Sequence, residues 1–333
     1  MIPEAQLWIW PLASGLATFL VLLGLLRLRR HLPVDVPNAR SLHWVGTPRI
    51  GGLGMLLGAG TVMAIYLLQV AAGSAQLYIA AGAALALSLV SLADDFKPLP
   101  VVLRLCAHMT AAGWVAAMSD LPVMTVIVVV LLLVWMANLY NFMDGSDGLA
   151  GSMALLGFMT YALAAWPLAP DIALASAMLA AAAAGFLIFN FPPARIFMGD
   201  AGSVPLGFLA GSLGLAGWHA GVWSAEFPLL AFFPFIADST YTLIRRAANR
   251  EAVWRAHNKH CYQRLVRMGW SHRKVLFLYL LLMAMPMLAS AHVMPIVVGE
   301  ADLLIFMFFA FLCLIAWVEI KWRRFVSLQA PGN

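Results

Sequence analysis

Residues 122–148 read PVMTVIVVVLLLVWMANLYNFMDGSDG, and this stretch decides the fold. Its first part, 122–140, is almost wholly apolar and close to the roughly 20 residues that a helix needs to cross the hydrocarbon core of a bilayer. The run ends in two Asp-Gly pairs, which are typical of a tight polar turn. An apolar span followed directly by a polar turn predicts an α-helical protein that crosses a membrane.

The rest of the chain repeats this pattern. With 63% hydrophobic and 11% charged residues and a mean hydropathy of +0.89, the composition excludes a soluble domain. We predict an all-α integral membrane protein of about 11 transmembrane helices, folded as a single polytopic membrane domain over residues 1–333. The expected spans are 7–26, 51–70, 75–93, 101–118, 122–140, 150–167, 172–191, 203–219, 226–244, 274–293 and 301–320.

The positive charges define the orientation. All 20 lysines and arginines fall in alternate connections, whereas the other connections carry only acids such as Asp120, Asp171 and Glu226. The positive-inside rule therefore places the N-terminus outside and the C-terminus in the cytoplasm. The pI near 9.3 favours anionic lipids or anionic substrates as partners, and no nucleic acid. The cytoplasmic loops that carry candidate site residues are 27–50, 94–104, 141–149, 192–202 and 245–274.

Two adjacent acids, Asp94 and Asp95, end the third expected span. Carboxylates at a helix C-terminus oppose the macrodipole, at a cost of about 0.3–1 kcal/mol each. They are either solvated loop acids beside Lys97 or part of a site that handles magnesium or phosphate, because carboxylates bind hard cations that bridge phosphates.

The double turn Asp144-Gly145 and Asp147-Gly148 has two asparagines, Asn138 and Asn141, on the preceding helical turns. A simple capped turn needs only one Asp-Gly pair. The repetition, with amide donors and acceptors upstream, favours a ligand site over a plain turn.

A second polar segment, 190–203, precedes the eighth expected span. Asp200 at the start of that helix is either an N-cap, worth about 1 kcal/mol, or a metal ligand that the helix start holds in place. Arg195 is a candidate phosphate contact, and Phe197 is an aromatic side chain suited to stacking on a base.

Histidines complete the candidate set. His257 and His260 lie in a basic run, where the absence of a nearby third ligand argues against zinc and leaves phosphate contact or proton handling. In the early loop, Arg49 and His43 are placed to meet an anionic lipid phosphate, and the glycines that follow, beginning at Gly51, are expected to serve helix packing.

The order of these motifs resembles the polyprenyl-phosphate N-acetylhexosamine-1-phosphate transferases of glycosyltransferase family 4, which are related to phospho-MurNAc-pentapeptide transferase. The most specific matches are NFMDGSDGLAG at 141–151 and FMGDAGS at 197–203, and the resemblance extends from about 35 to 269. The segment DVPNARS at 35–41 is most similar to the branch that initiates O-antigen synthesis. Ser146, where the family usually has an apolar residue, and His108, where glutamine is expected, depart from the pattern.

The resemblance implies transfer of a sugar-1-phosphate from a UDP-N-acetylhexosamine to undecaprenyl phosphate with release of UMP, in the bacterial inner membrane, which makes the N-terminal side periplasmic. It also implies Mg²⁺, with Mn²⁺ as an alternative ion, and it is compatible with a homodimer. Asp94, Asp95, Asp200 and His260 are the implied catalytic residues, with Asp200 and Asp94 as metal ligands. The expected substrate contacts are Asn138, Asn141, Asp144, Gly145, Asp147, Phe197, Arg195, Arg104, Arg49, His43 and His257.

Two other classes compete with this interpretation. A secondary transporter should have its polar site near the bilayer midplane, where Asp238 is the main ionisable candidate. A CDP-alcohol phosphotransferase also uses Asp-Gly motifs, but its motif requires an arginine where this chain has Ser152. GlcNAc, FucNAc and QuiNAc donors all fit the sequence, and so do direct attack by the lipid phosphate and a covalent aspartyl intermediate.

Overall fold

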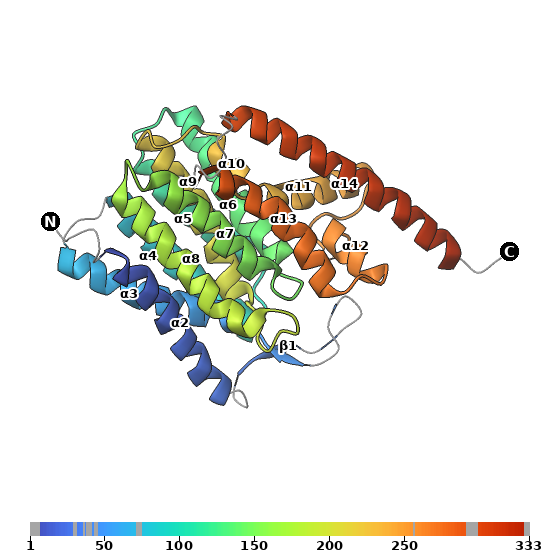
Figure 1. The fold of residues 1–333 in the computed structure, drawn as a ribbon, viewed down its shortest axis with the longest axis horizontal. Helices are drawn as coiled ribbons and strands as arrows, with labels where there is room; N and C mark the ends of the chain where they lie inside the picture. Colours follow the sequence, from blue (N-terminus) through green and yellow to red (C-terminus); the bar gives the residue numbers. More distant parts are fainter. Residues whose placement is uncertain are drawn as a thin grey trace.

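The computed structural model describes residues 7–28, 32–35, 37, 42, 46–70, 75–255, 257–290 and 299–329. Figure 1 shows a bundle of helices, with a small strand pair at its lower edge. Within the described residues the helices are α2 (Ile9–Arg27), α3 (Gly51–Val70), α4 (Ala75–Phe96), α5 (Val101–Ala117), α6 (Val123–Met143), α7 (Leu149–Ala165), α8 (Pro170–Asn190), α9 (Asp200–His219), α10 (Phe227–Ala231), α11 (Phe233–Ala248), α12 (Cys261–Arg267), α13 (His272–Ser290) and α14 (Glu300–Gln329).

Seven helices in the described part of the chain are long and apolar enough to cross a membrane: α2, α3, α4, α6, α8, α13 and α14. Two further helices of the bundle, α5 and α7, are apolar but shorter. Large apolar side chains such as Leu68, Leu131 and Phe309 remain exposed on the outer surface, which suits contact with lipid tails rather than water. The prediction of an all-α membrane protein is therefore confirmed at the level of fold class.

Helix α9 lies deep in the bundle, packed mainly against α4 and α6. Small residues make this close packing feasible. A Cβ added at Gly207 would lie 2.3 Å from the carbonyl oxygen of Met136, and one at Gly202 would lie 2.2 Å from the Cα of Gly52. Backbones that approach this closely require glycine, in the manner of small-residue helix interfaces in membranes.

The expected single span at 226–244 differs from the structure. The segment forms the short helix α10 and then α11, with a break at Phe232. Pro228 and Pro234 lie in the first turns of these two helices, where the missing N–H groups need no partner and where proline disfavours continuation of a preceding helix. The strict all-α expectation also needs one addition, because β1 (Val34–Asp35) pairs antiparallel with β2 (Thr47–Pro48).

Two acids, one buried and one partly buried, hold the loop between α11 and α13. Asp238 of α11 accepts hydrogen bonds from the backbone N–H groups of Cys261 (2.8 Å) and Tyr262 (3.2 Å) and from the hydroxyl of Tyr279. These bonds hold the start of α12 against the bundle.

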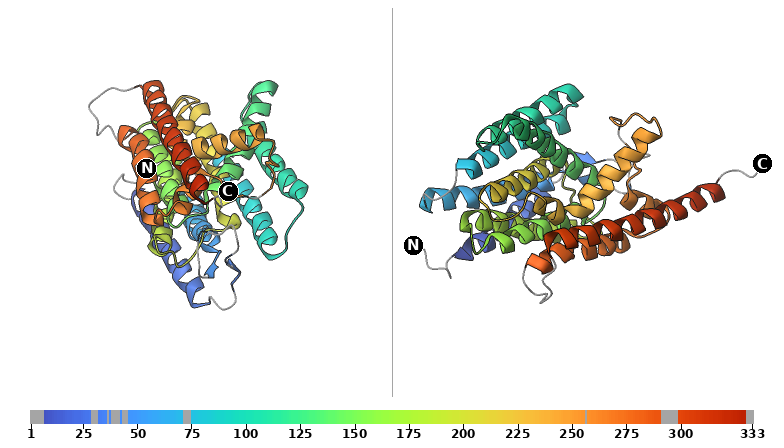
Figure 2. Two further views of the ribbon diagram at one scale, coloured as in Figure 1. Left: turned by 90° about the vertical axis from the view of Figure 1, so that its right-hand side faces the viewer. Right: turned by 90° about the horizontal axis from the view of Figure 1, so that it is seen from above.

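The second acid, Glu319, lies on α14. It accepts hydrogen bonds from Tyr241 (2.7 Å) and from Arg264, and it pairs with Arg245 at 3.0 Å. Glu319 thereby connects α14 to α11 and α12. Figure 2 shows α14 crossing the side of the bundle obliquely and projecting beyond it toward the C-terminus.

Candidate active site

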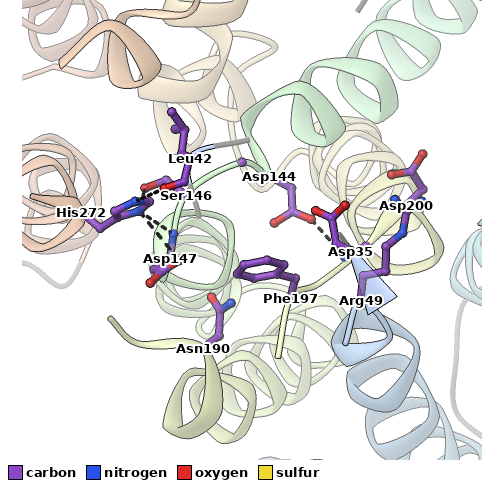
Figure 3. A pocket seen from close by; sticks show the side chains of 12 residues that line it. Asp35, Leu42, Arg49, Asp144, Ser146, Asp147, Asn190, Phe197, Asp200 and His272 are labelled. Carbon is purple, nitrogen blue, oxygen red and sulfur yellow. Dashed lines mark hydrogen bonds and ion pairs between the residues drawn. The ribbon is translucent and has the colours of Figure 1, made fainter. Parts of the chain in front are cut away.

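One polar pocket of about 100 Å³ gathers six of the fifteen predicted site residues (Figure 3). It lies where α6 and α8 end and where α3, α9 and α13 begin, so several connections meet at one end of the bundle. Its lining consists of Asp35, Leu42, Arg49, Asp144, Gly145, Ser146, Asp147, Asn190, Phe197, Gly199, Asp200 and His272.

Backbone hydrogen bonds join the segment that leads into α3 to the segment that leads into α9. The N–H of Phe197 donates to the carbonyl of Pro48, and the N–H groups of Gly51 and Gly52 donate to the carbonyls of Phe197 and Met198, each at 2.8 Å. A Cβ at Gly52 would lie 2.3 Å from the Cα of Gly202. The Gly-Gly pair that opens α3 is therefore required by the contact that positions Phe197 and the start of α9, and the expected packing role of these glycines is confirmed for Gly52.

The double Asp-Gly turn is fixed to the same loop through its carboxylates. Asp144 accepts the N–H of Gly199 at 3.1 Å, and Asp147 accepts the N–H of Ala194 at 3.0 Å. The side chain of Asn190 also connects the two loops: it accepts the N–H of Gly148 (3.0 Å) and donates to the carbonyl of Ile196 (2.9 Å). The repeated Asp-Gly pair thus connects two loops, which a single capped turn would not do.

Asp144 has the most perturbed electrostatics among the acids of the pocket. Burial, together with the nearby charge of Asp200, raises the pKa of Asp144 to about 7, although the hydrogen bond from Gly199 acts in the opposite direction. In the described part of the chain, no hydrogen bond reaches the carboxylate of Asp200. Two carboxylates that share a site and lack sufficient compensation form a place where a cation would be stabilised.

Magnesium fits this donor set in a particular way. Among the described residues there is no group of three or more His, Cys, Asp or Glu side chains arranged to hold a metal ion. Mg²⁺, however, is commonly held by one or two carboxylates together with substrate phosphates and water. The oxygen ligands of Asp200 and Asp144 suit that mode, whereas a cage made entirely of protein ligands is not formed by the described residues.

Arg49 supplies positive charge at the edge of the pocket. Its guanidinium pairs with Asp95, whose side chain is only 1% exposed. The Nε of Arg49 and one oxygen of Asp95 are buried without a hydrogen-bond partner among the described residues. Buried polar atoms are normally satisfied, so the Nε of Arg49 leaves one donor unused beside the pocket.

The neighbouring acid, Asp94, has a different environment. It accepts the N–H of Leu99 at 2.6 Å and pairs with Arg104 at 2.9 Å, and neither Asp94 nor Arg104 lines the pocket. Both remain predicted site residues, and the structure places them beside the Arg49–Asp95 pair.

Phe197 and Gly145, two of the predicted substrate contacts, both line the pocket. The ring of Phe197 lies in the middle of the labelled side chains in Figure 3, between the Asp147 and Asp35 sides of the pocket. A Cβ at Gly145 would lie 2.3 Å from the hydroxyl oxygen of Tyr262, which itself donates to the carbonyl of Phe142 at 3.1 Å. Gly145 is therefore required by packing against α12 as well as by its place in the pocket.

His272 is the main pocket residue that the sequence reasoning missed. Its Nδ1 lies 2.8 Å from the hydroxyl of Ser146 and 3.3 Å from the N–H of Asp147, and its Nε2 lies 3.1 Å from the carbonyl of Leu42. It thus connects three loops. The only signal in the sequence was the departure at Ser146, whose hydroxyl now has a partner. Asp35 and Asn190 also line the pocket and were not predicted as site residues.

Several predicted contacts lie away from the pocket lining. Asn138 donates to a backbone carbonyl (2.7 Å) and lies 3.2 Å from His108, while Asn141 accepts the hydroxyl of Ser203 at 2.8 Å. Arg195 packs over an aromatic ring and donates to a carbonyl of α8 at 3.0 Å. His43 lies outside the described residues.

The histidine loop is more buried than expected. His260 is 2% exposed and lies 3.6 Å from Asp238, and the ring of His257 lies 4.8 Å from that of His260. Burial, the charge of His260 and neighbouring cations lower the pKa of His257 to about 4. Neither histidine lines the pocket, so their catalytic and phosphate-binding roles stay predictions.

Known proteins are similar to this chain over much of its length. Residues 77–217 match glycosyl transferase family 4. The chain is 30% identical over 266 residues, covering 74% of each protein, to a probable undecaprenyl-phosphate N-acetylglucosaminyl 1-phosphate transferase of Bacillus subtilis. It is 29% identical over 298 residues, covering 74% of this chain and 72% of the relative, to a decaprenyl-phosphate N-acetylglucosaminephosphotransferase of Mycobacterium tuberculosis.

A shorter match reaches a third kind of relative. The chain is 43% identical over 89 residues, or 26% of its length and 28% of the relative, to a phospho-N-acetylmuramoyl-pentapeptide-transferase of Anoxybacillus flavithermus. The fold and the pocket define a helical membrane protein whose acids and cations gather at one end of the bundle. The chain belongs to glycosyl transferase family 4, as its motifs predicted.

Proposed function

We propose that this protein transfers an N-acetylhexosamine-1-phosphate from a UDP-sugar to undecaprenyl phosphate and releases UMP. We place the reaction at the cytosolic face of the bacterial inner membrane, in a chain of about eleven spans with a periplasmic N-terminus. The product would initiate O-antigen or a related cell-surface glycan.

The observation that carries the proposal is the convergence of Asp144, Asp147, Phe197, Asp200 and Arg49 on one pocket at the ends of apolar helices. A lipid phosphate stays at the membrane surface while its tail stays in the bilayer, so a site at the helix ends can reach both a lipid and a soluble nucleotide. The names of the Bacillus subtilis and Mycobacterium tuberculosis relatives describe N-acetylglucosamine phosphate transferases that use undecaprenyl phosphate and decaprenyl phosphate.

We assign the donor nucleotide to the Phe197 side of the pocket, where the ring can stack on uracil while Asp147 and Gly145 contact the nucleoside. The diphosphate then lies between Asp144, Asp200 and Arg49. Mg²⁺ bound by Asp200, with Asp144 in place of the predicted Asp94, would neutralise the charge that develops on the phosphate oxygens.

The protein's own contribution is alignment and charge. Arg49 is held by Asp95, so its guanidinium is already oriented at the pocket edge and can bind the acceptor phosphate. A phosphate monoester with a second pKa near ~6 is mostly dianionic at neutral pH, so a strong general base is not required. Asp95 then acts by orienting Arg49 rather than by removing a proton.

Neither rival class is favoured by the site. The acid expected of a transporter pathway, Asp238, is wholly buried and its carboxylate is bonded to the start of α12 and to Tyr279. The acidic pocket lies at the helix ends rather than midway along the spans, and the family match lies with the glycosyl transferases rather than with the CDP-alcohol enzymes.

The test is release of labelled UMP by the purified protein in lipid with Mg²⁺, undecaprenyl phosphate and a panel of UDP-sugars. We expect release that depends on the lipid acceptor and that Asp200→Asn abolishes. The matched control is Asp171→Asn at the start of α8, roughly 28 Å along that helix from Asn190 at the pocket, which should retain activity. No UMP release with any donor, or full activity of a folded Asp200→Asn variant, would overturn the proposal.

A further inference from the structure

The start of α13 closes one end of the candidate active site, and the chemistry proposed above gives it no role. Figure 3 shows His272 grouped with Leu42 and Ser146 at one end of the pocket, whereas Arg49 and Asp200 lie at the other. The diphosphate is assigned to the end with Arg49, so the end with His272 is left for the nucleoside half of the donor.

The hydrogen-bond partners of His272 define which of its ring nitrogens carries a proton. The backbone N–H of Asp147 can only donate, so Nδ1 of the ring accepts at 3.3 Å. The carbonyl of Leu42 can only accept, so Nε2 donates at 3.1 Å. The hydroxyl of Ser146, 2.8 Å from Nδ1, then donates to the same nitrogen. These partners fit the neutral tautomer with its proton on Nε2, and both nitrogens are used within the protein.

Because its nitrogens are occupied, His272 acts on a substrate through its partners, and the partner that can meet a ligand is Asp147. One carboxylate oxygen of Asp147, Oδ2, accepts the N–H of Ala194 at 3.0 Å. The other, Oδ1, lies 3.8 Å from Nδ1 of His272, which is too far for a hydrogen bond. Since Asp147 lines the pocket, Oδ1 offers an acceptor to a ligand donor such as the N–H of a uracil ring.

The start of α13 is held in place by contacts that do not involve the nitrogens of His272. Arg273 donates to the carbonyl of Pro192 from two nitrogens, at 3.1 and 3.3 Å. A Cβ added at Gly148 would lie 2.8 Å from a methyl carbon of Leu276, so the helix packs directly on the double Asp-Gly turn. Loss of the hydrogen bonds of His272 should therefore loosen that turn without detaching the helix.

We propose that His272, together with Ser146, is a positioning residue for the donor nucleotide. It fixes the backbone of the Asp147 turn against the early loop at Leu42, so that Oδ1 of Asp147 faces the nucleoside. This inference rests on the proposed function. Ser146 stands where the family usually has an apolar residue, so the hydroxyl that meets His272 is a departure of this chain from the family pattern.

Substitutions of His272 separate the contributions of its two nitrogens. His272→Phe keeps a ring and removes both nitrogens. His272→Asn retains an acceptor near the Nδ1 position, within reach of Ser146 and Asp147, whereas His272→Gln retains a donor near the Nε2 position. The matched control is His219→Phe, the same change at the exposed end of α9, roughly 28 Å along that helix from its start at the pocket.

The readouts are the kinetic constants of UMP release and, without turnover, the Kd of UMP measured by calorimetry. We expect His272→Phe to raise KM for the UDP-sugar and the Kd of UMP roughly tenfold each, or about 1.4 kcal/mol. The kcat and the KM for undecaprenyl phosphate should stay as in the wild type, because the lost contacts serve donor binding alone. His272→Asn should recover most of the loss and His272→Gln a smaller part, and His219→Phe should match the wild type.

Ser146→Ala gives an independent check on the pair. This variant alone should raise KM for the UDP-sugar by a smaller factor than His272→Phe. The double variant should be no worse than His272→Phe, because the hydroxyl of Ser146 then has no ring nitrogen to bond. Fully additive losses would overturn the inference that the two residues act together. If His272→Phe does not fold, the same comparison is made with Ser146→Ala and His272→Asn.

A wild-type KM for the UDP-sugar in folded His272→Phe would overturn the inference while leaving the proposed function intact. A rise in KM for both substrates together with a lower Tm would also overturn it, because that combination would indicate a merely structural role. No UMP release from the wild-type protein would instead refute the proposed function. The Kd of UMP would then decide the inference, and a wild type that does not bind UMP would overturn it.

Discussion

Replacing Asp144 by asparagine should stabilise the protein at pH 8 although we expect the same change to abolish transfer. The pKa of Asp144 is raised from 3.8 to about 7 because burial and the charge of Asp200 disfavour its ionised form. Because the pKa of Asp144 is higher in the folded state than in the unfolded state, the folded state binds more protons between pH ~4 and ~7. The stability of the wild type therefore falls as the pH rises through that range. Asparagine cannot ionise and avoids the loss.

The size of the effect follows from the shift. About three pKa units at about 1.4 kcal/mol each give a penalty near ~4 kcal/mol at pH 8. Because the unfolded carboxyl already ionises near pH ~4, the part that develops between pH 5 and 8 is about 2–3 kcal/mol. Asp144→Asn should therefore match the wild type most closely under acid conditions and exceed it increasingly toward pH 8.

Thermal unfolding followed by the fluorescence of the twelve tryptophans measures this difference. Asp302→Asn, the same change at an exposed position, is the control and should leave the dependence of Tm on pH as in the wild type. Addition of Mg²⁺ should raise the Tm of the wild type more than that of Asp144→Asn, because the ion offsets the carboxylate charge. A Tm for Asp144→Asn that is equal to or below the wild-type value at pH 8, without Mg²⁺, would refute the reasoning.

Three further changes follow from contacts described above. Gly145→Ala should destabilise the protein by about 1–3 kcal/mol and reduce kcat/KM, because the new methyl group meets the hydroxyl of Tyr262. Adding Tyr262→Phe to this variant should restore activity, and a double variant no more active than Gly145→Ala alone would contradict this. Asp238→Asn should lower the free energy of unfolding by about 3 kcal/mol and release the start of α12 from α11. The measurements are a lower Tm and faster proteolysis after Arg255, and protease resistance equal to that of the wild type would argue against this role. His257→Gln should leave the pH profile of kcat/KM between pH 6 and 8 unchanged, because a pKa of about 4 keeps His257 neutral in that range. A shifted profile would show that His257 exchanges a proton during catalysis.

The helices were largely predictable because apolar length is a local property. The expected span 51–70 matches Gly51–Val70, and 75–93 differs from Ala75–Phe96 by one further turn at its end. Three of the four pocket carboxylates, Asp144, Asp147 and Asp200, were predictable for a similar reason, since their motifs leave acids at helix ends in a chain that is otherwise apolar.

What the sequence could not decide depends on contacts between distant segments. His272 reaches Ser146 across 126 residues of chain, and no local pattern indicates that distance. Asp94 and Asp95 are chemically identical in sequence, but successive residues of a helix point in different directions. Only Asp95 therefore meets Arg49, while Asp94 turns to Arg104. The break at Phe232 likewise reflects how α10 and α11 pack, because a proline near a helix start is compatible with a new helix or with the first turn of a long one.

The length of α14 makes the thickness of the membrane part of the protein's structure. Its 30 residues extend about 45 Å, whereas a hydrocarbon core measures about 30 Å, so the helix must incline or project. A thinner or thicker bilayer changes that inclination at a cost of only fractions of a kcal/mol per ångström. Because Glu319 ties α14 to Arg245 and Arg264, each change in tilt is transmitted to α11 and α12. The loop between α11 and α13 is thus held on one side by the protein core and, through α14, on the other by the lipid that surrounds that helix.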